Sequence, residues 1–200
     1  MLDASPNDIA PLSPYREVKP VRTAWSLHRD PQLAVRELAD GLQHAHLGAV
    51  LFFCSTEYPL DELGHALDET FPHVPVSGCT TAGEITPTGY GRGCVVAIGF
   101  DRRFFTVAPT LIADLESFDL LRAQCLVDKL LGECRRQSTV SASDHSFALT
   151  LLDGLSSSEE QVLATLDAAL GNIPSFGGSA GDDNRLAHTY VYHRGHFHSQ

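Results

Sequence analysis

Apolar and polar residues follow one another in blocks that predict alternating strands and helices. Apolar or alternating segments of strand length occupy 21–27, 49–54, 74–79, 95–100 and 147–152, and the continuous runs among them suit strands that are buried on both faces. Between them, apolar residues three and four apart predict amphipathic helices. The helical stripes are Ala34, Leu38, Leu42 and Ala45; Leu60, Leu63, Leu67 and Phe71; Leu120, Ala123, Val127, Leu130, Leu131 and Cys134; and Val162, Leu163, Leu166, Ala169 and Leu170.

Capping residues support two of these helices. Asp30 followed by Pro31 is typical of an N-cap with proline at the first helical position. Ser156 and Ser157 each precede a glutamate by three residues, which predicts a capping box at the start of the last helix.

The remaining segments are assigned by turn residues and alternation. Residues 86–93 contain a proline and three glycines, so they predict a loop. Residues 104–111 alternate and predict a hairpin partner for 95–100. Residues 137–144 read as a polar linker and 189–198 as a last strand.

This order of elements predicts an α/β fold in which mixed sheets are flanked by helices. Residues 51–100 and 149–198 follow the same plan of strand, helix, glycine-rich turn and strand. The first leucine lies 24 residues before a proline in one copy and 25 in the other. We therefore expect an internally duplicated strand-helix-strand-strand unit.

Two glycine-rich motifs, VSGCTTAGE at 76–84 and SFGGSAGDD at 175–183, stand at the same place in the two copies. Glycine allows close approach of a backbone or a ligand, and ligands of open α/β sheets lie at the carboxyl ends of strands. We predict one binding site built from both motifs. Its residues are Gly78, Cys79, Thr80, Thr81, Gly83, Glu84, Gly177, Gly178, Ser179, Gly181 and Asp182.

The chemistry expected of this site is binding. Turn N–H groups can hold an anion or a zwitterion, although both motifs lack the nucleotide-binding fingerprints. Glu84 and Asp182 occupy matching positions, so as a pair they could bind an amine, hold a metal or act as acid and base. The alternatives are that the turns serve packing only and that each carboxylate caps the turn after it.

Cys79 would be the nucleophile if the protein were an enzyme. No histidine shows a partnering signature, and a reactive thiol needs a lowered pKa. We expect Cys79 to be an inert small residue and the protein not to be an enzyme. Cys54, Cys94, Cys125 and Cys134 fall on apolar stripes and are predicted to be core residues.

Composition limits the classes of partner that the protein is expected to bind. The formal net charge is −11, which disfavours nucleic acid and anionic membrane surfaces as partners. The chain shows no secretory signal and no apolar run of membrane-spanning length, and its five cysteines do not form a disulfide framework. We expect a cytoplasmic protein with a flexible arm at residues 1–20 and one domain at 21–200.

Four of the ten histidines crowd the end of the chain. Histidine is a common metal and haem ligand, and His188 and His193 are the candidates. Neither a zinc-module spacing nor a haem-attachment motif is present, so the alternative is a set of exposed histidines on a terminal strand.

The GCTTAGE turn, the later FGGSAGDD segment and Asp153-Gly154-Leu155 resemble the N-terminal half of the FIST domain, a bacterial and archaeal sensory family. The similarity runs from about residue 21 to the end, and a C-terminal half would follow in the family. We therefore expect these residues to be a fragment of a longer protein.

The resemblance implies a ligand sensor for signal transduction, with no catalytic role. Some members of the family bind haem, sense nitric oxide and regulate a histidine kinase of a two-component system that controls biofilms. We expect this chain to be such a sensor, with His188 or His193 as haem ligand and a kinase, and a second copy in a homodimer, as partners. The alternative is a haem-free amino-acid sensor that uses the two glycine motifs.

Overall fold

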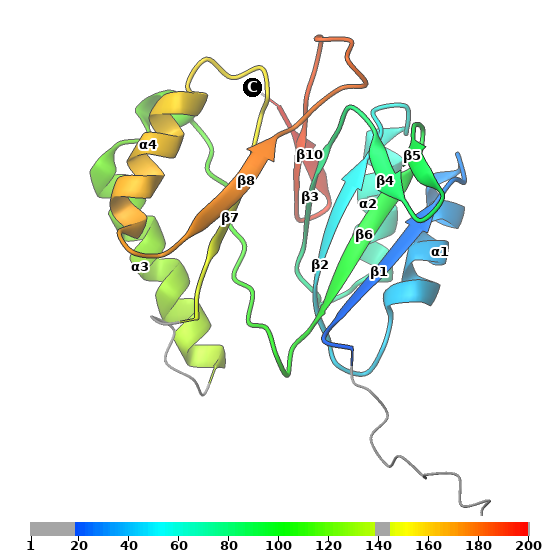
Figure 1. Cartoon of the computed structure of the whole chain (residues 1–200), viewed down its shortest axis with the longest axis horizontal. Helices are drawn as coiled ribbons and strands as arrows, with labels where there is room; N and C mark the ends of the chain where they lie inside the picture. The colour runs from blue at the N-terminus through cyan, green and yellow to red at the C-terminus, as the bar shows by residue number, and fades with distance from the viewer. Residues whose placement is uncertain (1–18, 139–144, 200) are drawn as a thin grey trace, which may run out of the picture.

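A computed structural model describes residues 19–138 and 145–199. Figure 1 shows two groups of strands side by side, with helices on their outer sides. The elements are β1 (Val21–Ser26), α1 (Pro31–Leu42), β2 (Leu47–Cys54), α2 (Leu60–Thr70), β3 (Val76–Thr80), β4 (Glu84–Thr86), β5 (Gly89–Gly91), β6 (Val95–Asp101), η1 (Leu115–Ser117), α3 (Leu120–Gln137), β7 (Ala148–Leu152), α4 (Glu159–Leu170), β8 (Ser175–Ser179), β9 (Val191–His193) and β10 (His196–His198). The predicted α/β class, with mixed sheets flanked by helices, is confirmed.

The larger sheet has six strands in the order β1-β6-β2-β3-β9-β10. Only β2 and β3 are neighbours that run parallel, since α2 connects them as a crossover. Leu38 of α1, Leu67 of α2 and Phe52 of β2 are fully buried in one cluster. Alternation along β2 then leaves Leu51 and Phe53 on the opposite face, half-buried.

The second group consists of β7 and β8, which pair parallel as a two-stranded sheet, with α3 and α4. Leu152 of β7 packs with Ala123 of α3 and with Val162 and Leu166 of α4. Each group therefore contains a strand-helix-strand unit with parallel strands. The strands around the two units differ, so the internal duplication stays a prediction.

The predicted strand at 104–111 does not form. In the structure β6 already lies between β1 and β2, so no free edge remains for a hairpin partner. Phe104 and Phe105 instead turn back, their N–H groups donating to the carbonyl of Asp101, and the Phe105 ring contacts Phe100 at 5.3 Å.

Two other predicted segments differ in detail. The last strand is a hairpin, because Arg194 and Gly195 take positive φ values of 48° and 83° and turn β9 back into β10. The predicted loop at 86–93 contains most of the β4–β5 hairpin.

Three helix predictions are corrected. The N-cap of α4 is Ser158, without a side-chain cap, because the helix begins at Glu159 and the predicted capping residues Ser156 and Ser157 precede the cap. Helix α1 starts at the predicted Asp30 cap, whose side chain accepts from the Leu33 N–H, but it ends before Ala45. Cys125 is exposed on α3 rather than in the core.

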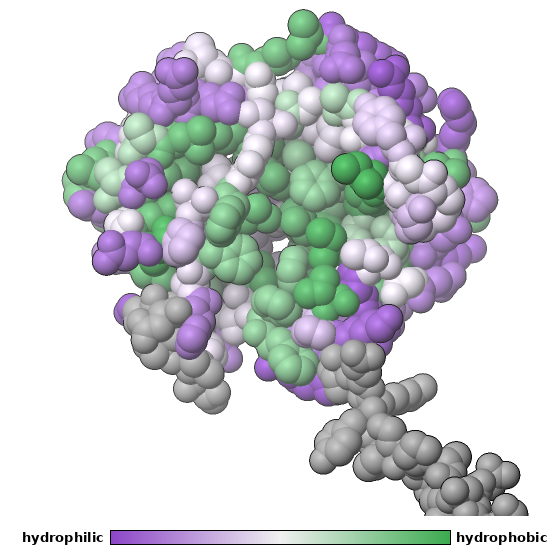
Figure 2. All heavy atoms as spheres, viewed as in Figure 1, coloured by the Kyte–Doolittle hydropathy of each residue, from purple (hydrophilic) through white to green (hydrophobic). Residues whose placement is uncertain are grey.

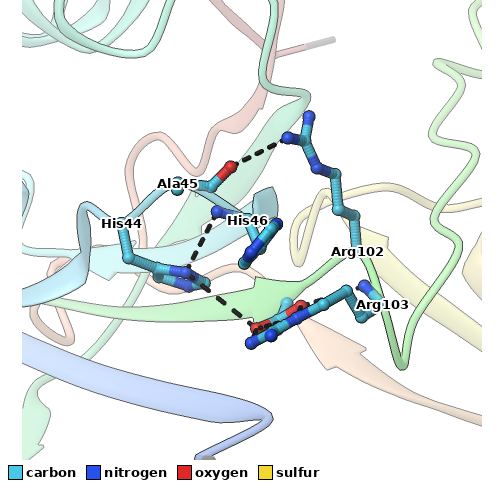
Figure 3. Close-up of polar contacts among 6 residues, drawn as sticks. His44, Ala45, His46, Arg102 and Arg103 are labelled. Atoms are coloured by element: carbon cyan, nitrogen blue, oxygen red, sulfur yellow. Dashed lines mark hydrogen bonds and ion pairs between the residues drawn. The ribbon is translucent and has the colours of Figure 1, made fainter.

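A buried carboxylate ties the end of β6 to the turn before β2 (Figure 3). Asp101 is 1% exposed and accepts three hydrogen bonds from the Arg103 guanidinium, at 3.0, 3.2 and 2.6 Å. His44 approaches the same carboxylate at 4.0 Å. The guanidinium of Arg103 holds the pKa of Asp101 well below its usual range.

Residues 1–18, most of the predicted flexible arm, lie outside the described part of the chain. Within that part, no helix combines the length and apolarity that a membrane crossing needs.

Candidate ligand-binding site

The two glycine motifs lie side by side. The Gly181 N–H donates to the Thr80 carbonyl at 2.8 Å, and the Asp183 N–H donates to the Thr81 carbonyl at 3.0 Å. A Cβ on Gly181 would lie only 2.7 Å from the Ala82 nitrogen, so this contact requires glycine. The two turns therefore meet, and ligand binding between them stays a prediction.

Both pairs of parallel strands end at this junction. The Thr81 N–H donates to the Cys54 carbonyl at 3.0 Å after β2 and β3, and the Ala180 N–H donates to the Leu152 carbonyl at 2.7 Å after β7 and β8. The carboxyl ends of parallel strands are the usual place for a ligand in an α/β sheet.

Glu84 is buried at the centre of the junction, with 2% of its surface exposed. Its Oε1 accepts from the Thr81 hydroxyl at 2.6 Å, and its Oε2 accepts from the Cys94 thiol at 3.1 Å. Burial raises the pKa of Glu84, the two hydrogen bonds oppose this, and the charge of Asp183 raises it further.

The two carboxylate oxygens of Asp183 differ in their hydrogen bonds. Its Oδ2 accepts from the hydroxyls of Ser55 at 2.8 Å and Thr56 at 2.9 Å. Its Oδ1 is buried and has no hydrogen-bond partner among the described residues. An unpaired buried carboxylate oxygen is costly, so this atom marks a place for a donor.

Asp182 was predicted to pair with Glu84, but its carboxylate binds backbone N–H groups instead. Its carboxylate accepts from the backbone N–H groups of Leu186, Ala187 and His188, and these bonds, that of Ala187 first, lower its pKa. It caps the turn that follows, which was the alternative interpretation.

Strand register explains this correction. Cys54 pairs with Thr80 and Leu152 pairs with Ser179, so Thr80 and Ser179 are equivalent. Glu84 stands four residues after Thr80, and Asp183 stands four residues after Ser179. The matching acid is therefore Asp183.

The other predicted residues hold the junction together. The Thr80 hydroxyl accepts from the Tyr190 N–H at 3.0 Å, and the Gly83 N–H donates to the Thr81 hydroxyl at 3.2 Å. Gly78 and Gly177 pass so close to the carbonyls of Phe52 and Thr150 that a side chain would overlap with them. Several turn N–H groups predicted to hold an anion are thus already bonded within the protein.

Cys79 does not have the properties of a nucleophile. It is 3% exposed, and burial raises its pKa to about 12, so the reactive thiolate is suppressed. Gly178 and Ser179 of β8 are exposed, and a Cβ on Gly178 would meet nothing within 4 Å.

Within the described residues, the side chains of the candidate haem ligands are not among the hydrogen-bond partners of Glu84 and Asp183. His188 is exposed, and the centroid of its ring lies 6.4 Å from the centroid of the Tyr190 ring. His193 is half-buried on β9, opposite Ser77 and His196, and burial first, then Arg194 and His198, lowers its pKa.

Haem would need an apolar slot beside its axial ligand. A cavity of about 280 Å³ is lined by Leu111, Ile112, Ala113, Phe118, Arg122 and Leu126, and a cavity of about 30 Å³ by Arg29, Glu57, Tyr58 and Gly93. Neither contains His188 or His193. Within residues 19–138 and 145–199, no group of three or more His, Cys, Asp or Glu side chains is placed to hold a metal ion.

Two residues that line the smaller cavity are adjacent in sequence to residues that bind Glu84 and Asp183. Its Gly93 precedes Cys94, which donates to Glu84, and its Glu57 follows Thr56, which donates to Asp183. Arg29 and Arg185 approach the Glu57 carboxylate at 3.6 and 4.0 Å. Two positive side chains therefore contact a residue that is adjacent in sequence to Thr56, a hydrogen-bond partner of Asp183.

Sequence reasoning missed Ser55, Thr56, Cys94 and Asp183. Two signals for them were present. Ser55 and Thr56 follow directly after a buried parallel strand, where ligand-facing residues are expected, and Asp183 is the residue after the predicted Asp182. Cys94 left no signal, because it comes to Glu84 only through the β4–β5 hairpin.

An α/β domain that brings carboxylates to the carboxyl ends of its parallel strands has an arrangement common in ligand-binding domains. The sequence model of the FIST N domain matches residues 48–200, which include every residue of the junction, and the chain belongs to the FIST family. The FIST N domain is a sensory ligand-binding domain of signal transduction rather than a family of enzymes. No curated protein and no solved structure matches the chain.

Proposed function

We propose that this FIST N domain senses a small molecule with an ammonium group, such as an amino acid, and that the ammonium binds between Glu84 and Asp183. The observation that carries this proposal is the buried Oδ1 of Asp183, which lacks a hydrogen-bond partner in the described part of the chain. An ammonium group has three donors and a positive charge. It would satisfy that oxygen and offset the repulsion between the two carboxylates.

Nearby charges favour a zwitterion over a simple amine. Arg29 and Arg185 are both largely exposed, and each approaches Glu57 at 3.6 to 4.0 Å. Exposed pairs of this kind contribute little, about 0–1 kcal/mol, so a ligand carboxylate can compete for the guanidinium groups. The ammonium would then lie on Asp183 and the carboxylate on Arg29 or Arg185.

Burial of the atoms that would bind the ammonium requires a movement on binding. Glu84 is 2% exposed and the Oδ1 of Asp183 is buried, and the cavity of about 30 Å³ beside Arg29 and Glu57 accommodates a water-sized group but not a whole amino acid. The segment that carries Asp183 is the part expected to move, because Asp183, Asn184 and Leu186 all have positive φ values, between 54° and 63°. Such backbone strain is a common property of switch segments.

The moving segment would transmit the signal. Leu186 is 79% exposed, and Ile85 on the β4–β5 hairpin beside Glu84 is 83% exposed. A ligand that shifts the 181–188 loop would change this surface for a separate output protein, for which a histidine kinase is our proposal. The five cysteines are free, which suits a sensor in the reducing cytoplasm.

Haem with nitric oxide as signal is the competing proposal, and it rests on family resemblance rather than on the positions of His188 and His193. Haem added to the folded protein decides it by absorption spectroscopy. A stoichiometric Soret band that shifts with nitric oxide would establish this proposal, and a spectrum identical to free haem would remove it.

A thermal-shift screen of amino acids tests the leading proposal, since a ligand that binds only the folded state raises the melting temperature with concentration. L-Alanine and L-lactate form one matched pair in the screen, because they differ in the ammonium group. We expect stabilisation by at least one amino acid, none by its hydroxy acid, and none in Asp183→Asn. Asp128→Asn on the exposed side of α3 is the control variant, and a response kept in Asp183→Asn would contradict the proposal.

A further inference from the structure

Strand β8 is an open sheet edge. All five of its residues, 175–179, are exposed, and Phe176 is 62% exposed. Among the described strands only β7 pairs with it. A sheet of two strands is only marginally stable alone, and an open edge offers N–H and C=O groups to another chain.

The printed hydrogen bonds determine which backbone groups of β8 face outward. The Ala148 N–H donates to the Pro174 carbonyl, and the Ala180 N–H donates to the Leu152 carbonyl, so residues 174 and 180 face β7. Successive residues of a strand direct these groups to opposite sides. The outward residues are therefore Ser175, Gly177 and Ser179.

The edge of β8 lacks the features that normally protect an edge strand. Proteins block such edges with charged residues, prolines, bulges or very short strands. The six-stranded sheet follows this rule, since β1 carries Arg22 and β10 has three residues. The sequence SFGGS of β8 contains no charge and no proline, and β7 has none either.

We propose that β8 pairs with β8 of a second copy of this chain, antiparallel about a twofold axis at Gly177. The two-stranded sheets would then join into a four-stranded sheet in the order β7-β8-β8-β7. In this register Gly177 faces Gly177 of the partner, and Ser175 faces the partner's Ser179. These are the three outward residues, so all of their N–H and C=O groups form hydrogen bonds across the axis.

The side chains are self-complementary in the same register. Phe176 falls opposite the partner's Gly178, and a Cβ on Gly178 would meet nothing within 4 Å, which leaves room for the ring. Packing an aromatic ring across a strand glycine is a known way to stabilise a sheet.

The face that receives the ring is apolar. Phe147 and Leu149 are 56% and 47% exposed; Leu149 pairs with Phe176 in the sheet, and the Phe147 ring contacts Phe176 at 6.1 Å. Figure 2 shows apolar side chains gathered over the middle of the molecule on the viewed side. Pairing would cover Phe176, and the isologous contact closes as a dimer.

Sedimentation velocity over a range of concentrations tests this proposal, which is independent of the ligand site. We expect the wild-type chain to be a dimer, and Phe176→Lys and Gly178→Glu each to raise the dimer dissociation constant at least tenfold. The double variant F176K/G178E should regain much of the affinity, because each lysine then faces a glutamate. Leu121→Lys, which places a charge at an exposed leucine of α3, is the control, and circular dichroism checks the folds.

Three results would overturn the proposal. The first is a wild-type chain that stays monomeric at all concentrations, which would leave the edge to a strand of another protein. The second is an equal effect of Phe176→Lys and Leu121→Lys. The third is a double variant no better than the single variants, which contradicts the register.

Discussion

The backbone N–H of Asp183 donates to the carbonyl of Thr81 at 3.0 Å, which joins two motifs from opposite halves of the sequence. The side chains of the same two residues also belong to the candidate site. The Thr81 hydroxyl donates to Glu84, and the Asp183 carboxylate accepts from Ser55 and Thr56. One backbone bond therefore helps to position both the buried Glu84 and the half-buried Asp183.

Gly181→Ala should break this junction. Its Cβ would lie 2.7 Å from the Ala82 nitrogen and 2.9 Å from the Thr81 carbonyl carbon, and these are backbone atoms that cannot turn aside. We expect a loss of about 1–3 kcal/mol in the free energy of unfolding, as for other overpacked sites.

Gly132→Ala on α3 is the matched control, because its Cβ would meet only the end of the Arg136 side chain, at 3.6 Å, and alanine is a better helix former than glycine, so this change should not lower the free energy of unfolding. Urea denaturation measures both. Equal stability of the two variants would contradict the close approach of the motifs.

Glu84→Gln should make the protein more stable at neutral pH. Burial raises the folded pKa of Glu84 above its value of about 4.3 in an unfolded chain, so its contribution is favourable at low pH and is lost as the pH rises through the folded pKa. Each pKa unit of difference is worth about 1.4 kcal/mol.

Melting curves from pH 4 to pH 8 follow this effect. The glutamine variant should gain over the wild type as pH rises and lose the advantage near pH 4. A constant difference across the range would show that Glu84 does not titrate abnormally.

Asp101→Asn should weaken the clamp at the end of β6. Arg103 lowers the folded pKa of Asp101, so the carboxylate contributes stability above its unfolded pKa of about 3.9 and loses it as the pH falls. With Arg103 partly in solvent, we expect a cost of about 1–3 kcal/mol at pH 7. Urea denaturation should show this cost shrinking toward pH 3, and a cost independent of pH would contradict the charged contact.

Thiol labelling should separate the five cysteines. Cys125 is exposed and Cys134 partly exposed, whereas Cys54, Cys79 and Cys94 are buried, and burial raises the pKa of Cys79 and of Cys94 to about 12. Mass spectrometry of the native protein after iodoacetamide should find Cys125 modified first. Rapid labelling of Cys79 would revive a nucleophilic role.

Local patterns predicted most of the elements because apolar spacing and capping residues act over a few positions. Asp30 and the stripe of α2 are such cases. The arrangement of the candidate site was predicted in part: Glu84 and Thr81 lie at the junction of the two motifs, but the acid that matches Glu84 in strand register is Asp183. That choice depends on strand register, which shifts by one residue between the two units and is not visible in a motif alignment.

Such local patterns could not predict contacts between segments that are far apart in the sequence. Whether 104–111 could pair depended on the position of β6 between two other strands, and the contact of Cys94 with Glu84 depended on a hairpin with few strand signals. Both are properties of the assembled sheet rather than of any one segment.

Isothermal titration of the most stabilising amino acid from the screen into wild-type protein and into Asp183→Asn tests the central claim most directly. An ammonium bound at the free Oδ1 predicts saturable one-to-one binding to the wild type and at least a tenfold loss of affinity in the variant. The same affinity in both proteins, with the variant correctly folded, would show that the Glu84 and Asp183 carboxylates are not the binding site.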